Sequence, residues 1–248
     1  MSKVFIHGVP DTPVMWEGLV SALGLGDQDY IAPALPGFEA PAPSGFSSTK
    51  EAYSDWLISQ VEAEVQRTGG PVDVVGHDWG ALLTLRICSL RPDLFKSFAV
   101  ANALIDPVYR GHRMARLWAT PVVGELMMFL SRTQNFANGL KEAGMPEELA
   151  VKEVAYWEKP MRQSILSLYR SAKGLRFSEE WLEGLKNLPP KGMVLWGEYD
   201  PFVDLSVAKR FTEQWNYPLH VFENKGHWGI IEEPHVTAGI LKTFWNEA

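Results

Sequence analysis

Short apolar runs that alternate with segments of helical periodicity constrain the fold of this chain more than any other feature. Runs bounded by Gly, Pro, Asn or Asp have the length and composition of strands. The segments between them space apolar residues three and four apart, as amphipathic helices do. This alternation predicts an α/β fold, with a mostly parallel sheet and helices on both faces. The predicted strands are 3–6, 29–32, 71–75, 97–103, 191–196 and 218–222, and the predicted helices lie near 14–23, 49–67, 80–90, 205–215 and 234–246.

The middle of the chain departs from this alternation. Between Ala103 and Pro189 the strand signals stop and only helical spacing remains. A second proline follows Pro189 and separates this segment from the next apolar run. We therefore predict one core of residues 1–103 and 189–248, with residues 104–188 inserted as a helical lid. The helices predicted within the lid are 110–118, 121–141, 147–157, 159–172 and 178–184.

Composition narrows the classes of partner. The 23 Lys and Arg residues are outnumbered by 30 Asp and Glu residues, which leaves a net charge of −7. Nucleic acids and anionic membranes attract basic proteins, so we expect neither as a partner. A small neutral organic substrate is expected, and the sequence leaves a homodimer open. With no signal region and no apolar run of roughly 20 residues, the chain is predicted to be soluble and cytoplasmic.

The single cysteine and the histidines give no sign of a metal site or a disulfide. Cys88 lies in an apolar helical pattern, which favours a core position over a reactive thiolate. The His and carboxylate residues lack the clustering of a metal ligand set, so neither a metal nor a cofactor is expected.

A strand, a sharp turn and a helix come together around residue 78. The run 71–75 leads directly into Gly76-His77-Asp78-Trp79-Gly80, and a helical pattern follows. The Gly-x-Ser-x-Gly nucleophile elbow has this layout, because small residues on both sides permit a strained turn that projects the nucleophile into a pocket. Asp78 occupies the Ser position and is the candidate nucleophile. An aspartate that only caps the following helix would have the same local sequence.

Two later segments carry the other residues that such a nucleophile needs. Asp200 follows the predicted strand 191–196, and His227 follows the predicted strand 218–222. Ligands of open α/β sheets bind outside the carboxyl ends of the strands, where these loops begin. The order nucleophile, acid, histidine is also the order found with an elbow of this kind. The three residues are therefore predicted to form a catalytic triad.

The first predicted strand leads into His7-Gly8-Val9-Pro10. A loop at this position can bring the backbone N–H of Val9 towards Asp78. With the N–H of Trp79, it would form an oxyanion hole. A plain Gly-x-Pro turn is the alternative.

These motifs resemble those of the α/β-hydrolase branch that contains epoxide hydrolases and haloalkane dehalogenases. The resemblance rests on His-Gly-Val-Pro, Gly-His-Asp-Trp-Gly, Asp200 and Gly-His at 226–227, and it covers almost the whole chain. It implies the α/β-hydrolase fold, a mostly parallel sheet flanked by helices with an inserted helical lid. The two strands that usually precede the His-Gly-x-Pro loop and its strand have no counterpart, which predicts a shortened sheet edge.

Members of this branch form an alkyl ester on an aspartate. Attack on a saturated carbon requires an anion, and a carboxylate with a pKa of about 4 is ionised at neutral pH without a base. The resemblance implies that Asp78 displaces the leaving group and that His227 activates the water that hydrolyses the ester. Asp200 would orient His227 and stabilise its protonated form.

The leaving group distinguishes the two activities. An opened epoxide leaves as an alkoxide that needs a proton, whereas a halide needs only N–H donors. Tyr169, in Ser-Leu-Tyr-Arg, resembles the lid tyrosine that serves epoxide hydrolases as the acid. Tyr109, Tyr156 and His112 are candidates for a second donor. This pattern favours an epoxide hydrolase, which converts epoxides into vicinal diols.

A haloalkane dehalogenase is the alternative. Trp79 offers one indole N–H and Trp118 in the lid a second, although Val9 replaces the Asn that many dehalogenases carry. Fluoroacetate dehalogenases would call for Arg after the nucleophile. A serine esterase would need Ser at residue 78, and the intact triad makes a non-catalytic ligand-binding homologue a remoter alternative.

Overall fold

The computed structural model describes residues 2–39 and 41–246 of the chain. Its centre is a six-stranded sheet in the order β2-β1-β3-β4-β5-β6, in which every neighbouring pair of strands is parallel. The α/β prediction is confirmed. The strands are β1 (Lys3–Ile6), β2 (Tyr30–Ile31), β3 (Val72–His77), β4 (Phe95–Ala101), β5 (Gly192–Gly197) and β6 (Leu219–Phe222).

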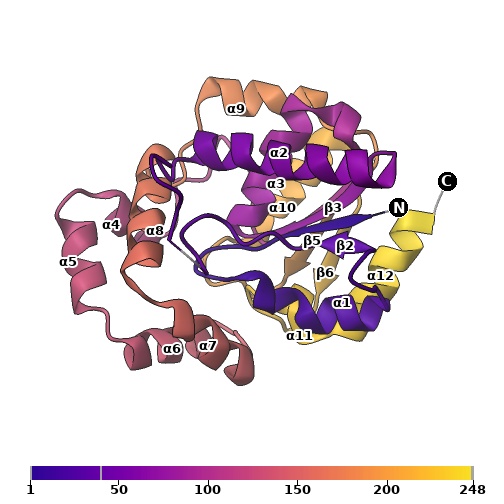
Figure 1. The fold of residues 1–248 in the computed structure, drawn as a ribbon. Helices are drawn as coiled ribbons and strands as arrows, with labels where there is room; N and C mark the ends of the chain where they lie inside the picture. Colours follow the sequence, from indigo (N-terminus) through magenta and orange to yellow (C-terminus); the bar gives the residue numbers. More distant parts are fainter. Residues whose placement is uncertain (1, 40, 247–248) are drawn as a thin grey trace.

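Helices cover both faces of the sheet (Figure 1). Two clusters of buried apolar side chains fill the spaces between helices and sheet, and the cluster beneath α2 and α3 contains Cys88, as expected of a core thiol. One face is covered by α2 (Lys50–Thr68), α3 (Trp79–Leu90) and α10 (Leu205–Trp215), and the other by α1 (Glu17–Leu23), α11 (Gly229–Glu232) and α12 (Pro234–Asn246). Short 3-10 helices are η1 (Pro13–Trp16), η2 (Pro92–Leu94), η3 (Val154–Tyr156) and η4 (Leu185–Asn187).

The register of the strands brings the motif loops to one edge of the sheet. Ile6 at the end of β1 lies beside Gly76 near the end of β3, and Gly197 at the end of β5 lies beside Phe222 at the end of β6. Because the strands are parallel, the loops that follow them start at the same edge. Residues far apart in the sequence can therefore meet there.

Five of the six predicted strands differ from their bounds in the structure, each by no more than two residues at either end. The predicted strand 29–32 is only Tyr30–Ile31, since β2 lies at the end of the sheet and pairs with β1 alone. The predicted strand 97–103 begins earlier, at Phe95. It also ends earlier, because Asn102 has φ 58°, a left-handed conformation that leaves the extended region.

The segment between β4 and β5 is helical. Its helices up to α8 lie beside the sheet edge, whereas its last helix, α9, packs on α3 (Figure 1). We keep the name lid for residues 104–188. None of the helices in the part of the chain that the structure describes is long and apolar enough to cross a bilayer. The lid helices are α4 (Arg113–Ala119), α5 (Val123–Leu130), α6 (Thr133–Glu142), α7 (Glu147–Glu153), α8 (Lys159–Ser171) and α9 (Glu179–Gly184).

The prediction of one helix over 121–141 is wrong. The chain is extended at Ser131 (ψ 107°) and Arg132 (ψ 143°), which separates α5 from α6. The predicted helix 147–157 also ends early, at Glu153, and continues as the 3-10 turn η3. Trp157, directly after that turn, stacks on Phe136 of α6 with ring centroids 3.6 Å apart. Packing between lid helices thus overrides the continuous apolar periodicity of the sequence.

Candidate active site

Asp78 stands at a strained turn between β3 and α3. Its backbone has φ 50° and ψ −123°, a conformation that residues other than glycine rarely adopt. A β-carbon on Gly76 would overlap the Gly80 carbonyl, and one on Gly80 would overlap the Ile6 carbonyl of β1, so both positions require glycine. The Asp78 side chain makes no capping hydrogen bond to α3 among the described residues. The turn is an elbow that directs this carboxylate away from the helix.

The Asp78 carboxylate receives two contacts from other loops at the sheet edge. The backbone N–H of Val9 donates to Oδ2 over 3.0 Å, and Nε2 of His227 lies 3.5 Å from Oδ1. Burial opposes ionisation of Asp78, but the hydrogen bond and charge of His227 outweigh it and lower the Asp78 pKa. The carboxylate is therefore an anion at neutral pH.

His227 is held from its other side by Asp200. Nδ1 of His227 lies 2.8 Å from Oδ2 of Asp200, and this oxygen also accepts a hydrogen bond from the Asn102 amide over 2.9 Å. The backbone N–H groups of Phe202 and Val203 donate to Oδ1 of Asp200 over 2.8 and 3.1 Å. Burial opposes ionisation of Asp200, but His227 and these donors lower its pKa. Asp200 is thus a fixed, negatively charged partner for the histidine.

The two carboxylates change the acidity of His227. Burial by itself would lower the His227 pKa, but Asp200 and Asp78 together raise it to about 10. At neutral pH the site therefore holds an imidazolium between two carboxylates. Loss of either negative charge would lower the His227 pKa.

The structure adds three residues that the sequence analysis missed. Asn102 follows β4, and a polar residue directly after a strand was the signal available. Nε2 of His77 lies 2.8 Å from the backbone oxygen of His227, and the two rings are 4.7 Å apart. Asp11 accepts a hydrogen bond from the Trp228 indole over 3.2 Å. These contacts hold the loop that carries His227.

A cavity of about 310 Å³ lies between the sheet edge and the lid. Most of its lining is apolar, and Lys and Arg are absent from the lining residues that the structure describes. The lining residues from the core are Val9, Pro10, Asp78, Phe202, His227 and Trp228, and those from the lid are His112, Met114, Trp118, Ser131, Asn135, Phe136, Gly139, Leu140 and Tyr169.

Three of the predicted lid residues line this cavity together. The rings of Trp118 and His112 lie 5.2 and 6.2 Å from the ring of Tyr169. Burial lowers the His112 pKa to about 4, so its ring is neutral at pH 7. Because His112 Nδ1 accepts a hydrogen bond from the Ala115 N–H over 3.2 Å, its proton is on Nε2. Burial, reinforced by the charge of Asp78, raises the Tyr169 pKa and keeps the phenol protonated.

The structure does not bring Tyr109, Tyr156 or the Trp79 side chain to the cavity wall. The Tyr109 hydroxyl instead donates to the Phe202 carbonyl over 2.9 Å. Tyr156 lines a separate hollow, together with Pro41 and other residues. The Trp79 indole packs at 5.3 Å from the Tyr169 ring, and its N–H is buried without an acceptor in the described part of the chain.

No group of three or more His, Cys, Asp or Glu side chains among residues 2–39 and 41–246 is arranged to hold a metal ion.

The sequence matches a known family along nearly its full length. Residues 4–240 match the alpha/beta hydrolase family, in agreement with the elbow, the parallel sheet and the loop order. The chain belongs to this family. This hydrolase is also similar in structure to a haloalkane dehalogenase from Bradyrhizobium elkani, with a TM-score of 0.76 and 18% identity over 98% of this chain and 90% of that one. At this identity the similarity shows the fold.

Relatives of both expected activities occur. Epoxide hydrolase 3 of Xenopus tropicalis is 21% identical over 98% of this hydrolase and 71% of its own length. A haloalkane dehalogenase of Psychrobacter cryohalolentis is 28% identical, over 41% of this hydrolase and 33% of its own length. Both names thus agree with the branch that the motifs indicate.

Proposed function

We propose that this hydrolase converts small neutral epoxides into vicinal diols through an ester on Asp78. One observation carries the proposal. An ionised carboxylate on the core side and two neutral hydrogen donors on the lid side, Tyr169 and His112, line one apolar cavity. Ring opening needs a nucleophile at carbon and a proton donor at the departing oxygen.

In the proposed first step, Oδ1 of Asp78 attacks an epoxide carbon. Oδ2 accepts the Val9 N–H, which leaves Oδ1, on the His227 side, as the attacking atom. The ring C–O bond breaks, and its electron pair stays on oxygen. Tyr169 transfers its proton to this alkoxide while the Nε2–H of His112 donates a hydrogen bond. The raised Tyr169 pKa keeps the proton available until the alkoxide forms.

In the second step, His227 activates a water that attacks the Asp78 ester carbonyl. Esterification removes the Asp78 charge, so the His227 pKa falls from about 10. The imidazolium then loses its proton, and a net transfer to the Tyr169 phenolate left by the first step restores the phenol. Neutral His227 can then act as the base while Asp200 holds its tautomer. The N–H groups of Val9 and Trp79 would stabilise the developing oxyanion on Oδ2.

The lining of the cavity limits the substrate class. Its largely apolar wall, without Lys or Arg among the described lining residues, gives a carboxylate substrate no opposite charge. The anion of Asp78 would repel such a substrate. We therefore propose neutral, mainly apolar epoxides of a size that a cavity of about 310 Å³ accommodates.

Haloalkane hydrolysis is the second candidate, because one observation favours it. The Trp79 indole N–H is buried without an acceptor, and Trp118 lines the cavity nearby. A pair of indole N–H donors can stabilise a departing halide. Reaching the halide would require the Trp79 N–H to become accessible from the cavity.

A paired turnover assay tests the choice, with styrene oxide and 1-bromobutane offered separately. We expect diol formation that is abolished in Asp78→Ala and falls by about 10²-fold or more in Tyr169→Phe. Tyr109→Phe is the matched control, since its hydroxyl lies outside the cavity wall. Bromide release that survives Tyr169→Phe but not Asp78→Ala would assign the dehalogenase activity instead. Full activity of Asp78→Ala would refute the Asp78 mechanism.

A further inference from the structure

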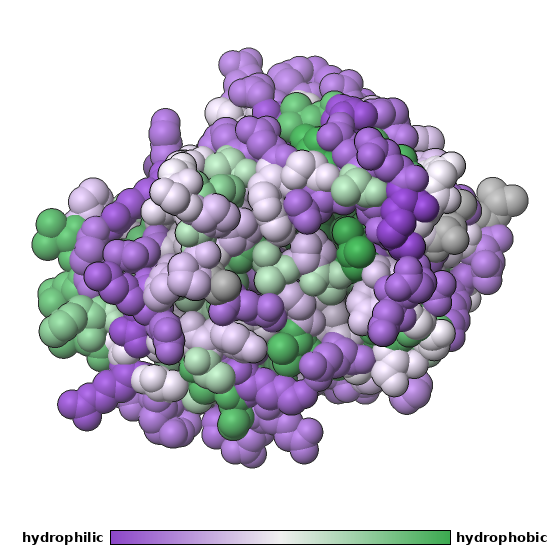
Figure 2. Space-filling model, in the orientation of Figure 1, coloured by the Kyte–Doolittle hydropathy of each residue, from purple (hydrophilic) through white to green (hydrophobic). Residues whose placement is uncertain are grey.

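Helix α5 of the lid is apolar on both of its faces. Its inner face, with Gly124 and Met128, is buried where α5 packs on α4 and α8. Three large apolar side chains on its outer face, and a fourth directly before the helix, are exposed by more than half of their area. Figure 2 shows a hydrophobic area at this place on the left. We call these residues the α5 stripe: Val122, Leu126, Phe129 and Leu130. A contiguous apolar stripe on a protein surface marks an interaction site.

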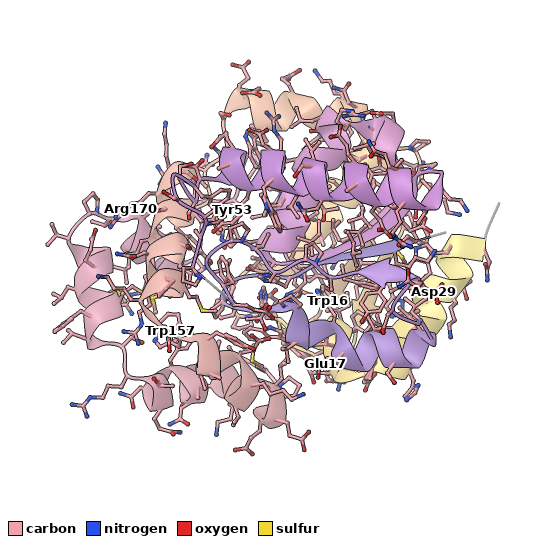
Figure 3. All side chains as sticks on the ribbon, in the orientation of Figure 1. Trp16, Glu17, Asp29, Tyr53, Trp157 and Arg170 are labelled. Carbon is pink, nitrogen blue, oxygen red and sulfur yellow. The ribbon has the colours of Figure 1, made fainter. Side chains whose placement is uncertain are left out.

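The segment that carries the α5 stripe is basic, although the chain as a whole is acidic. Residues 108–132 contain four Arg and one Glu, a net charge of +3, against −7 for the whole chain. That Glu, Glu125, forms an ion pair with Arg170 of α8, whose Nη2 lies 2.7 Å away; Figure 3 labels Arg170. Arg162 donates to a backbone carbonyl near the end of α5, and Arg132 is exposed just beyond it. This part of the lid is therefore positively charged, although the net charge of the whole chain is negative.

The α5 stripe also borders the cavity. Leu130 is followed directly by Ser131, which lines the cavity together with Asn135 and Met114. Met114 is 38% exposed, so the cavity reaches the surface beside this stripe. A surface that binds the stripe would face the cavity mouth.

From the stripe, its charges and its position, we propose that α5 docks this protein on bilayers that contain anionic phospholipids. The stripe enters the headgroup boundary, and the exposed Arg132 contacts lipid phosphates. The acidic core is repelled by the same surface, which turns the lid towards the bilayer. The cavity mouth then faces the bilayer, in whose apolar interior apolar molecules concentrate.

Charge also argues against a second copy of the chain on this face. A two-fold interface brings the same patch of both copies together, so the arginines around one stripe would meet those around the other. A phosphate-bearing surface offers the opposite charge instead. Docking needs no turnover, so it stands apart from the proposed function.

Vesicle co-sedimentation tests the docking. Vesicles of phosphatidylcholine and phosphatidylglycerol, in a ratio of about two to one, should bind the wild type, and pure phosphatidylcholine should bind less. The double substitution Leu126→Asp and Phe129→Asp should reduce the bound fraction by about tenfold or more. Val151→Asp is the matched control, because Val151 is an exposed apolar residue of α7 outside the stripe. Arg132→Glu should weaken binding to the mixed vesicles only.

Two further measurements keep the result interpretable. Leu126→Ser with Phe129→Ser should lower vesicle binding while circular dichroism stays that of the wild type, which excludes misfolding as the cause. Asp78→Asn should bind vesicles as the wild type does, because docking does not use the nucleophile. Wild-type protein that stays in the supernatant overturns the proposal. So does light scattering that shows a dimer which the double substitution converts into a monomer.

Discussion

The two walls of the cavity hold their titratable groups in opposite ways. On the core wall, Asp78 and His227 form an ion pair that Asp200 completes. On the lid wall, burial leaves His112 and Tyr169 uncharged at neutral pH. Both walls are buried, so burial alone does not decide the charge of a side chain here. The presence of an opposite charge within about 3.5 Å does.

Glu153 of α7 shows what happens when a buried carboxyl lacks such a partner. It is 2% exposed, and neither carboxylate oxygen has a hydrogen-bond partner in the described part of the protein. Burial, with the negative charge of Asp11, raises the Glu153 pKa to about 9. The core wall is therefore charged because its carboxylates and His227 pair with one another, and the lid wall is neutral. This arrangement suits nucleophilic attack with acid assistance.

Removing the base from the core wall should have the largest effect. In His227→Gln, Asp78 keeps the Val9 N–H and can still form the ester, but water is not activated. Turnover should fall by about 10³-fold, and the ester should accumulate. Intact-protein mass spectrometry after incubation with styrene oxide should show one added substrate mass, located at Asp78 by peptide mapping. A folded variant that stays unmodified would remove the covalent intermediate from the mechanism.

Neutralising Asp200 should come next in size. Asp200→Asn retains the shape but removes a negative charge, so the His227 pKa should fall from about 10 towards its ordinary value of 6.5. The amide can also donate to Nδ1 and favour the wrong tautomer, which should lower kcat by about 10²-fold. NMR titration of His227 measures the first effect. An unchanged His227 pKa would contradict the pairing that distinguishes the core wall.

A change on the lid wall should be smaller. His112→Phe removes one neutral donor and leaves Tyr169, so kcat/KM for the epoxide should fall by about tenfold. Because the His112 pKa is about 4, His112 stays neutral between pH 5.5 and 8, and its contribution to kcat/KM should not vary in this range. Comparing the pH profiles of the variant and the wild type checks this. His112→Asn keeps a capping oxygen for α4 and controls for lid stability. A contribution that disappears as pH rises through 6.5 would mean that His112 acts as a cation.

The smallest effect concerns stability. The raised Glu153 pKa means that the unfolded chain releases this proton above pH 4.5, while the folded chain keeps it until about pH 9. Its contribution to stability is therefore present below pH 4.5 and lost as pH rises towards 9. Glu153→Gln should raise the unfolding free energy by about 1–3 kcal/mol at pH 8 and little at pH 4. Urea unfolding at both pH values measures this change in unfolding free energy. Glu148→Gln, at an exposed position, is the control. An equal increase at both pH values would count against a buried, neutral Glu153.

The residues of the core wall could be predicted from the sequence because each lies in the loop that follows a strand. Asp78, Asp200 and His227 need only the register of a parallel sheet to meet. Asn102 also follows a strand, but a single polar residue without a motif carries too little signal. Its left-handed backbone, which turns the chain towards Asp200, is visible only in the structure.

The arrangement of the lid was harder to predict from the sequence, for a physical reason. A helical pattern predicts which residues are helical but not how each helix is rotated or where it breaks. Tyr169 and Tyr109 have similar sequence signals, yet Tyr169 lines the cavity and Tyr109 bonds to the Phe202 carbonyl. The break at Ser131 is likewise visible only in the backbone angles of Ser131 and Arg132, because the apolar spacing of the sequence continues across it.

The sequence by itself determined the α/β class, the elbow at Asp78 and the order of Asp78, Asp200 and His227. These features depend on local periodicity, on glycines that permit close approach, and on the way parallel strands align their ends. Only the tertiary structure decided which lid side chains face Asp78 and which groups are charged. Both depend on distances between residues far apart in the chain, since desolvation and Coulomb interactions act through space.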